Sequence, residues 1–156
     1  MRSLTLLRHS KPERDSATGR DFDRQLTEQG RSDAERLGGE IRGLGLDYDL
    51  VLASPAMRAV QTAEGVGLKA RLDERIYNAS TGELLALIQQ VASEVGRLML
   101  VGHNPGFEEL ASMLTGSPIA VSAGALVEIE LPIDEWSEAG RERGRLVRVI
   151  NPKDWD

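Results

Sequence analysis

The sequence predicts an α/β protein in which a buried sheet carries helices on both sides. Three apolar runs, at residues 4–7, 49–53 and 97–102, have the length and continuity of strands that are covered on both faces. Amphipathic helical patterns lie between these runs. In open α/β sheets, ligands bind outside the carboxyl ends of the strands, so we expect the functional residues at that edge.

Composition excludes several classes of function. We expect the 156 residues to form one domain, 1–156, that is long enough to bury its own core. The chain has no cysteine, which excludes disulfides, a thiolate nucleophile and thiol-based zinc sites. A net charge of −6 argues against broad binding to nucleic acid or to an anionic membrane surface. No apolar run approaches the roughly 20 residues that span a bilayer, and residues 1–3 leave no room for a signal peptide, so we expect a cytoplasmic protein.

Both histidines of the chain follow a predicted buried strand. His9 comes directly after the first apolar run, beside Arg8, and His103 follows the run at 97–102. Because the carboxyl ends of parallel strands meet at one edge of a sheet, we expect the two imidazoles to lie together. Arg8 beside them indicates a local site for an anion in an otherwise acidic protein.

The first connection is expected to be a polar loop followed by a helix. Residues 11–25 show no apolar period, and we expect them to form a solvated, charged loop over the end of the first strand. The alternative, favoured by the position of the loop beside Arg8 and His9, is that one of its cations lines the rim of the site. Thr27 is predicted to cap the helix that follows, because apolar positions then repeat with a helical period. Gly43 and Gly45 are expected to end this helix.

The second strand, 49–53, is followed by a predicted helix start. Ser54 is expected to cap the helix and Pro55 to occupy its first position, where a missing N–H is harmless. Arg58 then falls in the first turn, so that its side chain leans back over the end of the strand. Residues 69–72 form a possible short strand before a loop at 73–75.

Two more helix starts are predicted further along the chain. Residues 80–83 match a capping box, and the helix that they open has an apolar face extending to Val95. After the strand at 97–102, Asn104 is the expected cap and Pro105 the first helical residue. The helices after Ser54 and Asn104 thus begin at the edge that carries His9, and helix N-termini attract phosphate above all anions.

The last part of the chain changes character. Val127, Ile129 and Leu131 alternate with glutamates, and residues 146–150 form a similar strand around Arg148. We expect both strands to be half-exposed and to lie towards an edge of the sheet. The polar stretch between them is expected to be a long connection.

The candidate site combines two histidines and two arginines from three strand ends: Arg8, His9, Arg58 and His103. A metal site would need a third ligand, such as Asp21, Asp23 or Glu74. Arg8 would repel a dication, however, and the chain has no His-x-x-x-His or Glu-x-x-His spacing. A serine hydrolase elbow and a P-loop are excluded as well, because Gly-x-Ser-x-Gly and Gly-Lys-Ser/Thr do not occur.

Phosphoryl transfer to a histidine remains. A neutral imidazole nitrogen is a competent nucleophile towards phosphorus. Guanidinium groups that bind the equatorial oxygens stabilise the charge of the transition state, which suits Arg8 and Arg58. A protonated His103 could add another donor.

These residues lie in motifs that resemble the histidine phosphatase (phosphoglycerate-mutase-like) superfamily. The motifs, in the family's order, are Leu7-Arg8-His9, Leu26-Thr27-x-x-Gly30, Ser54-Pro55-x-x-Arg58-Ala59-x-Gln61-Thr62-Ala63 and Val101-Gly102-His103-Asn104. The short length, the start Arg8-His9-Ser10-Lys11 and the segments 21–24 and 76–79 are most similar to the SixA-type phosphohistidine phosphatase branch.

The resemblance implies a three-layer α/β/α fold with a mainly parallel sheet. It implies a phosphohistidine intermediate on His9 and a phosphate held by Arg8, Arg58 and His103, with Asn104 and Ser10 as further contacts. No metal or other cofactor is implied. The implied substrate is a phosphoprotein carrying phosphohistidine. A small phosphate ester, or binding of a phosphoprotein without catalysis, remains an alternative.

Two positions depart from the family's pattern or match it weakly. Ser10 stands where the family usually has glycine, which adds a side chain beside the nucleophile. Residues 72–75 resemble the segment that carries an acid/base glutamate in mutase-like members. Glu74 is therefore the expected acid/base group, although SixA-type enzymes match this segment less clearly.

Overall fold

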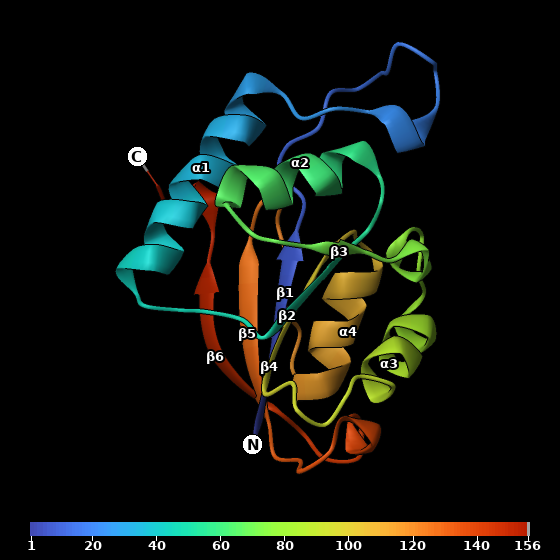
Figure 1. Ribbon diagram of the computed structural model, residues 1–156, viewed down its shortest axis with the longest axis vertical. Coiled ribbons are helices and arrows are strands. Elements are labelled where there is room, and N and C mark those ends of the chain that lie inside the picture. Colours follow the sequence, from blue (N-terminus) through green and yellow to red (C-terminus); the bar gives the residue numbers. More distant parts are fainter. Residues whose placement is uncertain (156) are drawn as a thin grey trace.

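The computed structural model describes residues 1–155, and Asp156, the last residue of the expected domain, lies outside them. Within 1–155, a mixed sheet of six strands is flanked by four α-helices (Figure 1). The strands, in the spatial order of the sheet, are β3 (Arg71–Leu72), β2 (Leu50–Ala53), β4 (Arg97–Gly102), β1 (Arg2–Arg8), β5 (Leu126–Leu131) and β6 (Arg145–Ile150). The helices are α1 (Glu28–Gly43), α2 (Met57–Val66), α3 (Thr81–Gln89) and α4 (Gly106–Thr115).

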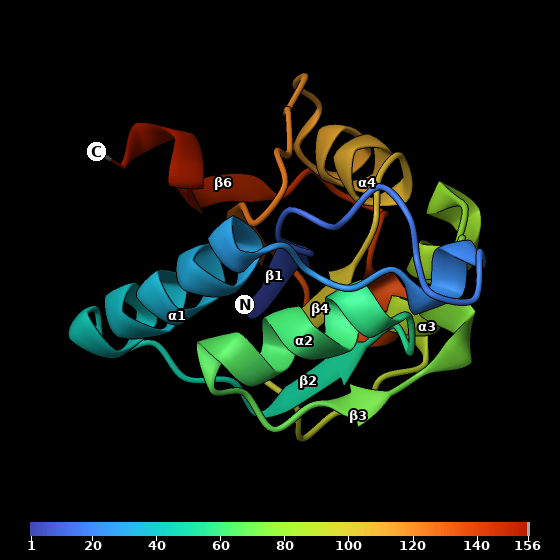
Figure 2. The same cartoon turned by 90° about the horizontal axis from the view of Figure 1, so that it is seen from above.

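Helices cover both faces of the sheet, as the buried apolar runs predicted. Seen from above, α1 and α2 lie on one side of the strands and α3 and α4 on the other (Figure 2). Each side has its own apolar core, one around Leu37 and Met99 and the other around Phe107 and Leu100. None of the helices within 1–155 combines the length and apolar character needed to cross a membrane.

Parallel register brings three strand ends to one edge. β1 pairs with β4 so that Arg8 lies opposite Gly102, and β2 pairs with β4 so that Ala53 lies opposite Val101. The residues that follow, among them His9 and His103, therefore leave the sheet at the same level. The predicted meeting of these strand ends is confirmed.

The start of α1 shows why its motif contains Thr27 and Gly30. The Thr27 hydroxyl accepts the N–H of Gly30 at 3.0 Å, which confirms the predicted cap. The Lys11 carbonyl oxygen accepts the N–H of Thr27, also at 3.0 Å. A Cβ at position 30 would lie 2.4 Å from that carbonyl oxygen, so any larger residue would push α1 away from the chain that follows His9.

Two helices begin later than predicted. α2 begins at Met57, with Ala56 rather than Ser54 at its cap position. α4 begins at Gly106, with Pro105 at the cap and Asn104 outside it. A turn separates strand from helix at both strand ends. The Ser54 hydroxyl bonds to the N–H of Ala56 within this turn and to His103, whereas the side-chain oxygen of Asn104 accepts the N–H of Glu108 in the first turn of α4 at 3.2 Å and so still caps that helix. The capping box of α3 is confirmed, but that helix ends at Gln89, before Val91 and Val95.

The strand β5 corrects the expectation of two half-exposed strands. β6 is an edge strand as predicted, whereas β5 lies between β1 and β6 and is largely buried. Its alternating glutamates do not all face solvent. Glu128 is 7% exposed and forms an ion pair with Arg148 on β6, with 2.8 Å between the charged atoms. The alternating pattern predicted that this carboxylate faces solvent, but an arginine of the neighbouring strand neutralises its charge instead.

Candidate active site

The ring of His9 is fixed by the main chain at the end of β1. Its Nδ1 lies 2.8 Å from the carbonyl oxygen of Ser10. A carbonyl oxygen only accepts, so Nδ1 carries the ring proton and Nε2 carries the lone pair. Burial lowers the pKa of His9 to about 4, and the charges of Arg58 and Arg8 add to this effect, while the bond to Ser10 opposes it. At neutral pH the ring is therefore uncharged, with a nucleophilic Nε2.

His103 follows β4 and is held by a hydroxyl from the end of β2. Its Nε2 lies 2.7 Å from Oγ of Ser54, which also accepts the N–H of Ala56 at 3.2 Å. Since Ser54 is fully buried, donating its proton to Nε2 is the arrangement that uses the hydroxyl completely. The ring proton then sits on Nδ1, an atom that is buried without a partner among residues 1–155.

His103 thus offers an N–H without carrying a charge. Burial lowers the pKa of His103 to about 3, with smaller contributions from His9 and Arg58. The protonated ring that the sequence suggested is not needed for donation, because the bond to Ser54 already selects the tautomer with a free Nδ1–H.

Arg8 lies on the other side of the site, against the loop before β5. Its NH1 donates to the carbonyl oxygen of Val121 at 3.0 Å. The same oxygen accepts the Asn104 amide at 2.8 Å, so one carbonyl positions both residues. The Nε of Arg8 is buried and has no partner in the described part of the chain. Burial lowers the pKa of Arg8, but an arginine remains charged at neutral pH.

Arg58 enters from the first turn of α2, as predicted. The residue is 5% exposed, and two of its nitrogens bind Asp21: NH1 donates to the carbonyl oxygen at 2.9 Å and NH2 to a carboxylate oxygen at 3.1 Å. Its Nε is buried and has no partner within 1–155. Arg58 thus keeps one edge of its guanidinium unused.

The four side chains lie together. The ring centroids of His9 and His103 are 5.2 Å apart, and the charges of both arginines lower the pKa of both imidazoles. The site therefore gathers a lone pair on His9 and unpaired N–H groups on His103, Arg8 and Arg58. A buried N–H group without a partner is unfavourable, and an oxyanion accepts strong, charge-assisted hydrogen bonds from arginine donors of this kind.

Two residues of the α2 motif, Thr62 and Gln61, connect the segments that form the site. The hydroxyl of Thr62 accepts the N–H of Ser10 at 2.9 Å and donates to the carbonyl oxygen of Arg58 at 2.7 Å. The side-chain oxygen of Gln61 accepts the N–H of Leu26 at 2.8 Å. These bonds attach the end of β1, which carries His9, and the start of α1 to the helix that carries Arg58.

The remaining predicted residues are Ser10, Asn104 and Glu74. Ser10 is 1% exposed, and its main chain is occupied by Thr62 and by the His9 ring. The Asn104 amide nitrogen donates to Val121 and Glu108, which occupies both of its hydrogens. Glu74 is exposed at the start of a short 3-10 helix, Glu74–Ile76, directly after β3.

Sequence reasoning missed three contributors to the site. Asp21 binds Arg58, the hydroxyl of Tyr77 donates to Asp21 at 2.8 Å, and Ser54 fixes the tautomer of His103. The Tyr77 ring also lies edge-on to His103, with centroids 5.7 Å apart. The sequence carried a signal for each: Ser54 begins one of the four family motifs, and Asp21 and Tyr77 fall in the two segments, 21–24 and 76–79, that resemble the SixA-type branch.

No group of three or more histidine, aspartate or glutamate side chains within 1–155 is placed to hold a metal ion. Asp21, one of the three residues that the metal alternative offered as a third ligand, is instead bound by Arg58, Arg24 and Tyr77. The arrangement suits an oxyanion, because its free donors are N–H groups and its free acceptor is one imidazole nitrogen.

Comparison with known proteins agrees with this geometry. An uncharacterized protein of Mycobacterium leprae is 32% identical over 144 residues, which cover 85% of this chain and 89% of that protein. A solved structure assigned as the phosphohistidine phosphatase SixA of Agrobacterium tumefaciens is 29% identical, with a TM-score of 0.83 and coverage of 97% and 98% of the two chains. The protein histidine phosphatase SixA in complex with tungstate shares the fold, with a TM-score of 0.83, 22% identity and coverage of 99% of each chain.

The family follows from the match along the chain. Residues 4–110, which contain all four motifs, match the histidine phosphatase superfamily (branch 1). The three-layer, mainly parallel architecture is the phosphoglycerate-mutase-like fold that the resemblance implied. The chain belongs to the histidine phosphatase superfamily.

Proposed function

We propose that residues 1–156 form one metal-independent histidine phosphatase domain that hydrolyses phosphohistidine on a phosphoprotein. The observation that carries the proposal is the meeting of one imidazole lone pair with unpaired N–H groups of three other side chains: Arg8, Arg58 and His103. The solved structures assigned as SixA, at 26% and 29% identity over nearly the whole chain, support this substrate class.

The reaction proceeds in two displacements. In the first, the lone pair of His9 Nε2 attacks phosphorus, and the bond to the leaving group breaks with its electron pair. A leaving oxygen takes up a proton, whereas a leaving imidazole is protonated beforehand on its other ring nitrogen and departs neutral. In the second, a water oxygen attacks phosphorus, the bond to Nε2 breaks, and phosphate departs as the water proton is released. Arg8 and Arg58 stabilise the charge on the phosphoryl oxygens in both steps.

The site suits phosphohistidine because the leaving group of this substrate needs no general acid from the protein. An imidazole leaves as a neutral molecule once the ring nitrogen that does not carry phosphorus is protonated, and a free histidine side chain titrates near ~6.5. Solvent can supply this proton, so a buried general acid is not required. Glu74, the predicted acid/base group, is exposed, which fits a reaction that needs little help at this step.

A panel of substrates tests the proposal. Purified protein is assayed with a phosphohistidine peptide, phosphoserine and phosphotyrosine peptides and a sugar phosphate, with and without EDTA. We expect the phosphohistidine peptide to have the highest kcat/KM and EDTA to have no effect. A preference for the sugar phosphate would indicate a small-molecule phosphomonoesterase. Loss of activity in EDTA that a divalent ion restores would indicate a metal site. Binding of the phosphopeptides without turnover would indicate a phosphoprotein-binding domain.

A further inference from the structure

The loop at 11–25 provides a carboxylate that binds the phosphate-binding arginine. Asp21 begins a short 3-10 helix, Asp21–Asp23, and accepts two hydrogen bonds from Arg58. The two donors are NH1 and NH2, the terminal nitrogens of the guanidinium. The two residues are 37 positions apart in the sequence, so the contact is purely tertiary.

The contact divides the guanidinium into a used and an unused part. Arginine has five N–H bonds in one plane. Asp21 takes one from each terminal nitrogen, which leaves three, among them the N–H of the buried Nε. A phosphoryl group can therefore be bound through the remaining edge while Asp21 stays in place.

Asp21 is itself held from two other segments. Its second carboxylate oxygen accepts Nε of Arg24 at 3.0 Å, and Tyr77 donates to the oxygen that binds Arg58. Partial burial acts to raise the pKa of Asp21, but the hydrogen bond of Tyr77 and the charge of Arg58 outweigh it and lower the pKa. The carboxylate is thus ionised throughout the neutral range, and its geometry is fixed by three partners.

We propose that Asp21 is a positioning residue, which orients the guanidinium of Arg58 so that its free edge faces the phosphoryl oxygens. This rests on the proposed function, in which Arg58 binds the phosphoryl group. Tyr77 acts one step further out, because its hydroxyl fixes the oxygen that Arg58 uses. Without Asp21 the long arginine side chain would rotate, and its donors would be lost from the site for most of the time.

The experiment compares two aspartates of the same turn. Asp21→Asn removes the charge and one acceptor at nearly constant shape. Asp23→Asn is the matched control, because Asp23 accepts a hydrogen bond from Thr18 at 2.6 Å, whereas Arg58 binds Asp21 and not Asp23 within 1–155. Binding of inorganic phosphate is measured by calorimetry, and kcat/KM is measured with the phosphohistidine peptide. Arg58→Ala and the double variant Asp21→Asn/Arg58→Ala complete a double-mutant cycle.

We expect Asp21→Asn to weaken phosphate binding and to lower kcat/KM on the order of 10²-fold, with most of the loss in kcat, since misplacement of a binding group can have an effect of this size. Tyr77→Phe should lower kcat/KM by about tenfold. Asp23→Asn should stay within twofold of wild type. In the Arg58→Ala background, Asp21→Asn should change nothing further, because its effect passes through Arg58.

Three outcomes would overturn the positioning role. They are unchanged kinetics in Asp21→Asn, an equal loss with and without Arg58, and tighter phosphate binding in Asp21→Asn, which would make Asp21 a competitor for the guanidinium. If wild type turns over the peptide and Asp21→Asn matches it, the positioning role fails and the proposed reaction stands. If wild type binds phosphate in an Asp21-dependent way but hydrolyses nothing, the proposed reaction fails and the positioning role stands.

Discussion

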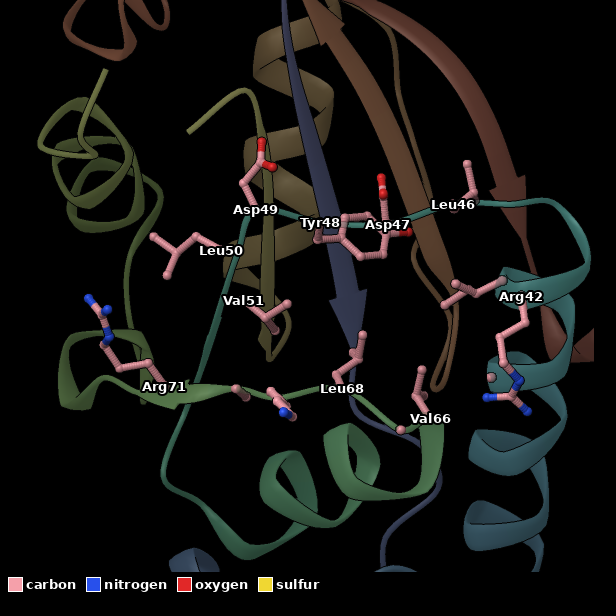
Figure 3. A pocket seen from close by; sticks show the side chains of 15 residues that line it. Arg42, Leu46, Asp47, Tyr48, Asp49, Leu50, Val51, Val66, Leu68 and Arg71 are labelled. Atoms are coloured by element: carbon pink, nitrogen blue, oxygen red, sulfur yellow. The ribbon is translucent and has the colours of Figure 1, made fainter. Parts of the chain in front are cut away.

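The two ends of the parallel strands differ in what they offer a ligand. At the carboxyl end, His9, His103 and Arg58 lie together with hydrogen-bonding atoms unused. At the amino end, a hollow of about 590 Å³ lies between the start of β2 and the ends of α1 and α2, with Val51, Val66 and Leu68 among its lining residues (Figure 3). The amino end provides ample space, whereas the carboxyl end provides reactive groups.

The contrast follows from how polar groups are satisfied. In the hollow, one carboxylate oxygen of Asp49 accepts the N–H groups of Gly96 and Arg97 at 2.9 and 2.8 Å, so it already serves the fold. The buried hydroxyl of Tyr48 lacks a partner within 1–155. Because burial raises the pKa of Tyr48, this hydroxyl stays neutral and does not provide a charged group in the hollow. Volume alone is therefore a poor guide to chemistry here, and unpaired N–H donors beside a free imidazole nitrogen are a better one.

The largest loss of activity is expected when His9, the proposed nucleophile, is removed. His9→Ala should reduce turnover to background while the protein stays folded, because β1 does not depend on the imidazole. Wild type quenched rapidly with labelled phosphohistidine should carry an acid-labile, base-stable phosphoryl adduct. Full activity in His9→Ala, or no adduct in wild type, would show that the nucleophile lies elsewhere.

The next largest effect concerns the buried arginine. Arg58→Ala should lower kcat/KM by about 10²–10³-fold, as for other donors lost from a preorganised site. Arg58→Lys should recover little, since an ammonium cannot bind Asp21 and a phosphoryl group with one planar fork. The measurement is steady-state kinetics with the phosphohistidine peptide. A near wild-type rate in Arg58→Ala would place this residue outside the reacting centre.

Replacement of Glu74 should lower the hydrolysis of phosphate esters more than that of phosphohistidine. A phosphate ester expels a basic alkoxide, so loss of a general acid should lower its hydrolysis by about 10²-fold, the low end of the usual range, because the carboxylate is exposed. Glu74→Gln should affect phosphohistidine much less. Rates on a phosphoserine and a phosphohistidine peptide are compared. Equal losses would assign Glu74 to the water step, and no loss on either would remove it from the site.

The carboxyl end should also make folding stability sensitive to acid. The folded-state pKa values, about 4 for His9 and about 3 for His103, lie below the ~6.5 of an unfolded histidine. The unfolded chain therefore binds more protons between these values, and the free energy of unfolding should fall by several kcal/mol as pH drops from ~6.5 to ~4. Denaturant titrations at a series of pH values measure this. In His103→Asn the decline should be shallower, and an unchanged slope would contradict the assignment.

The smallest effect is expected at the amino end. Lys69 and Arg71 line the hollow and are exposed, so the double variant Lys69→Ala/Arg71→Ala should leave kcat/KM within twofold and change the free energy of unfolding by less than about 1 kcal/mol. Kinetics and denaturation check both values. A tenfold loss of activity would mean that the two ends are coupled and that the contrast between them is incomplete.

The sequence by itself determined the buried strands, the fold class and the placing of His9, Arg58 and His103 at strand ends. These features follow from local pattern, because the length of an apolar run and the residue that ends it are set by neighbours in the chain. The resemblance of four motifs added the family, which the comparison over residues 4–110 confirmed.

Tertiary structure alone decided how the site is assembled. Ser54 bonds to His103 across 49 positions, which selects the tautomer, and Asp21 bonds to Arg58 across 37. Sequence pattern cannot show such pairs, because they depend on which strand ends and loops meet in space. The same holds for Glu128, whose polarity predicted exposure but whose charge is buried against Arg148 of the neighbouring strand.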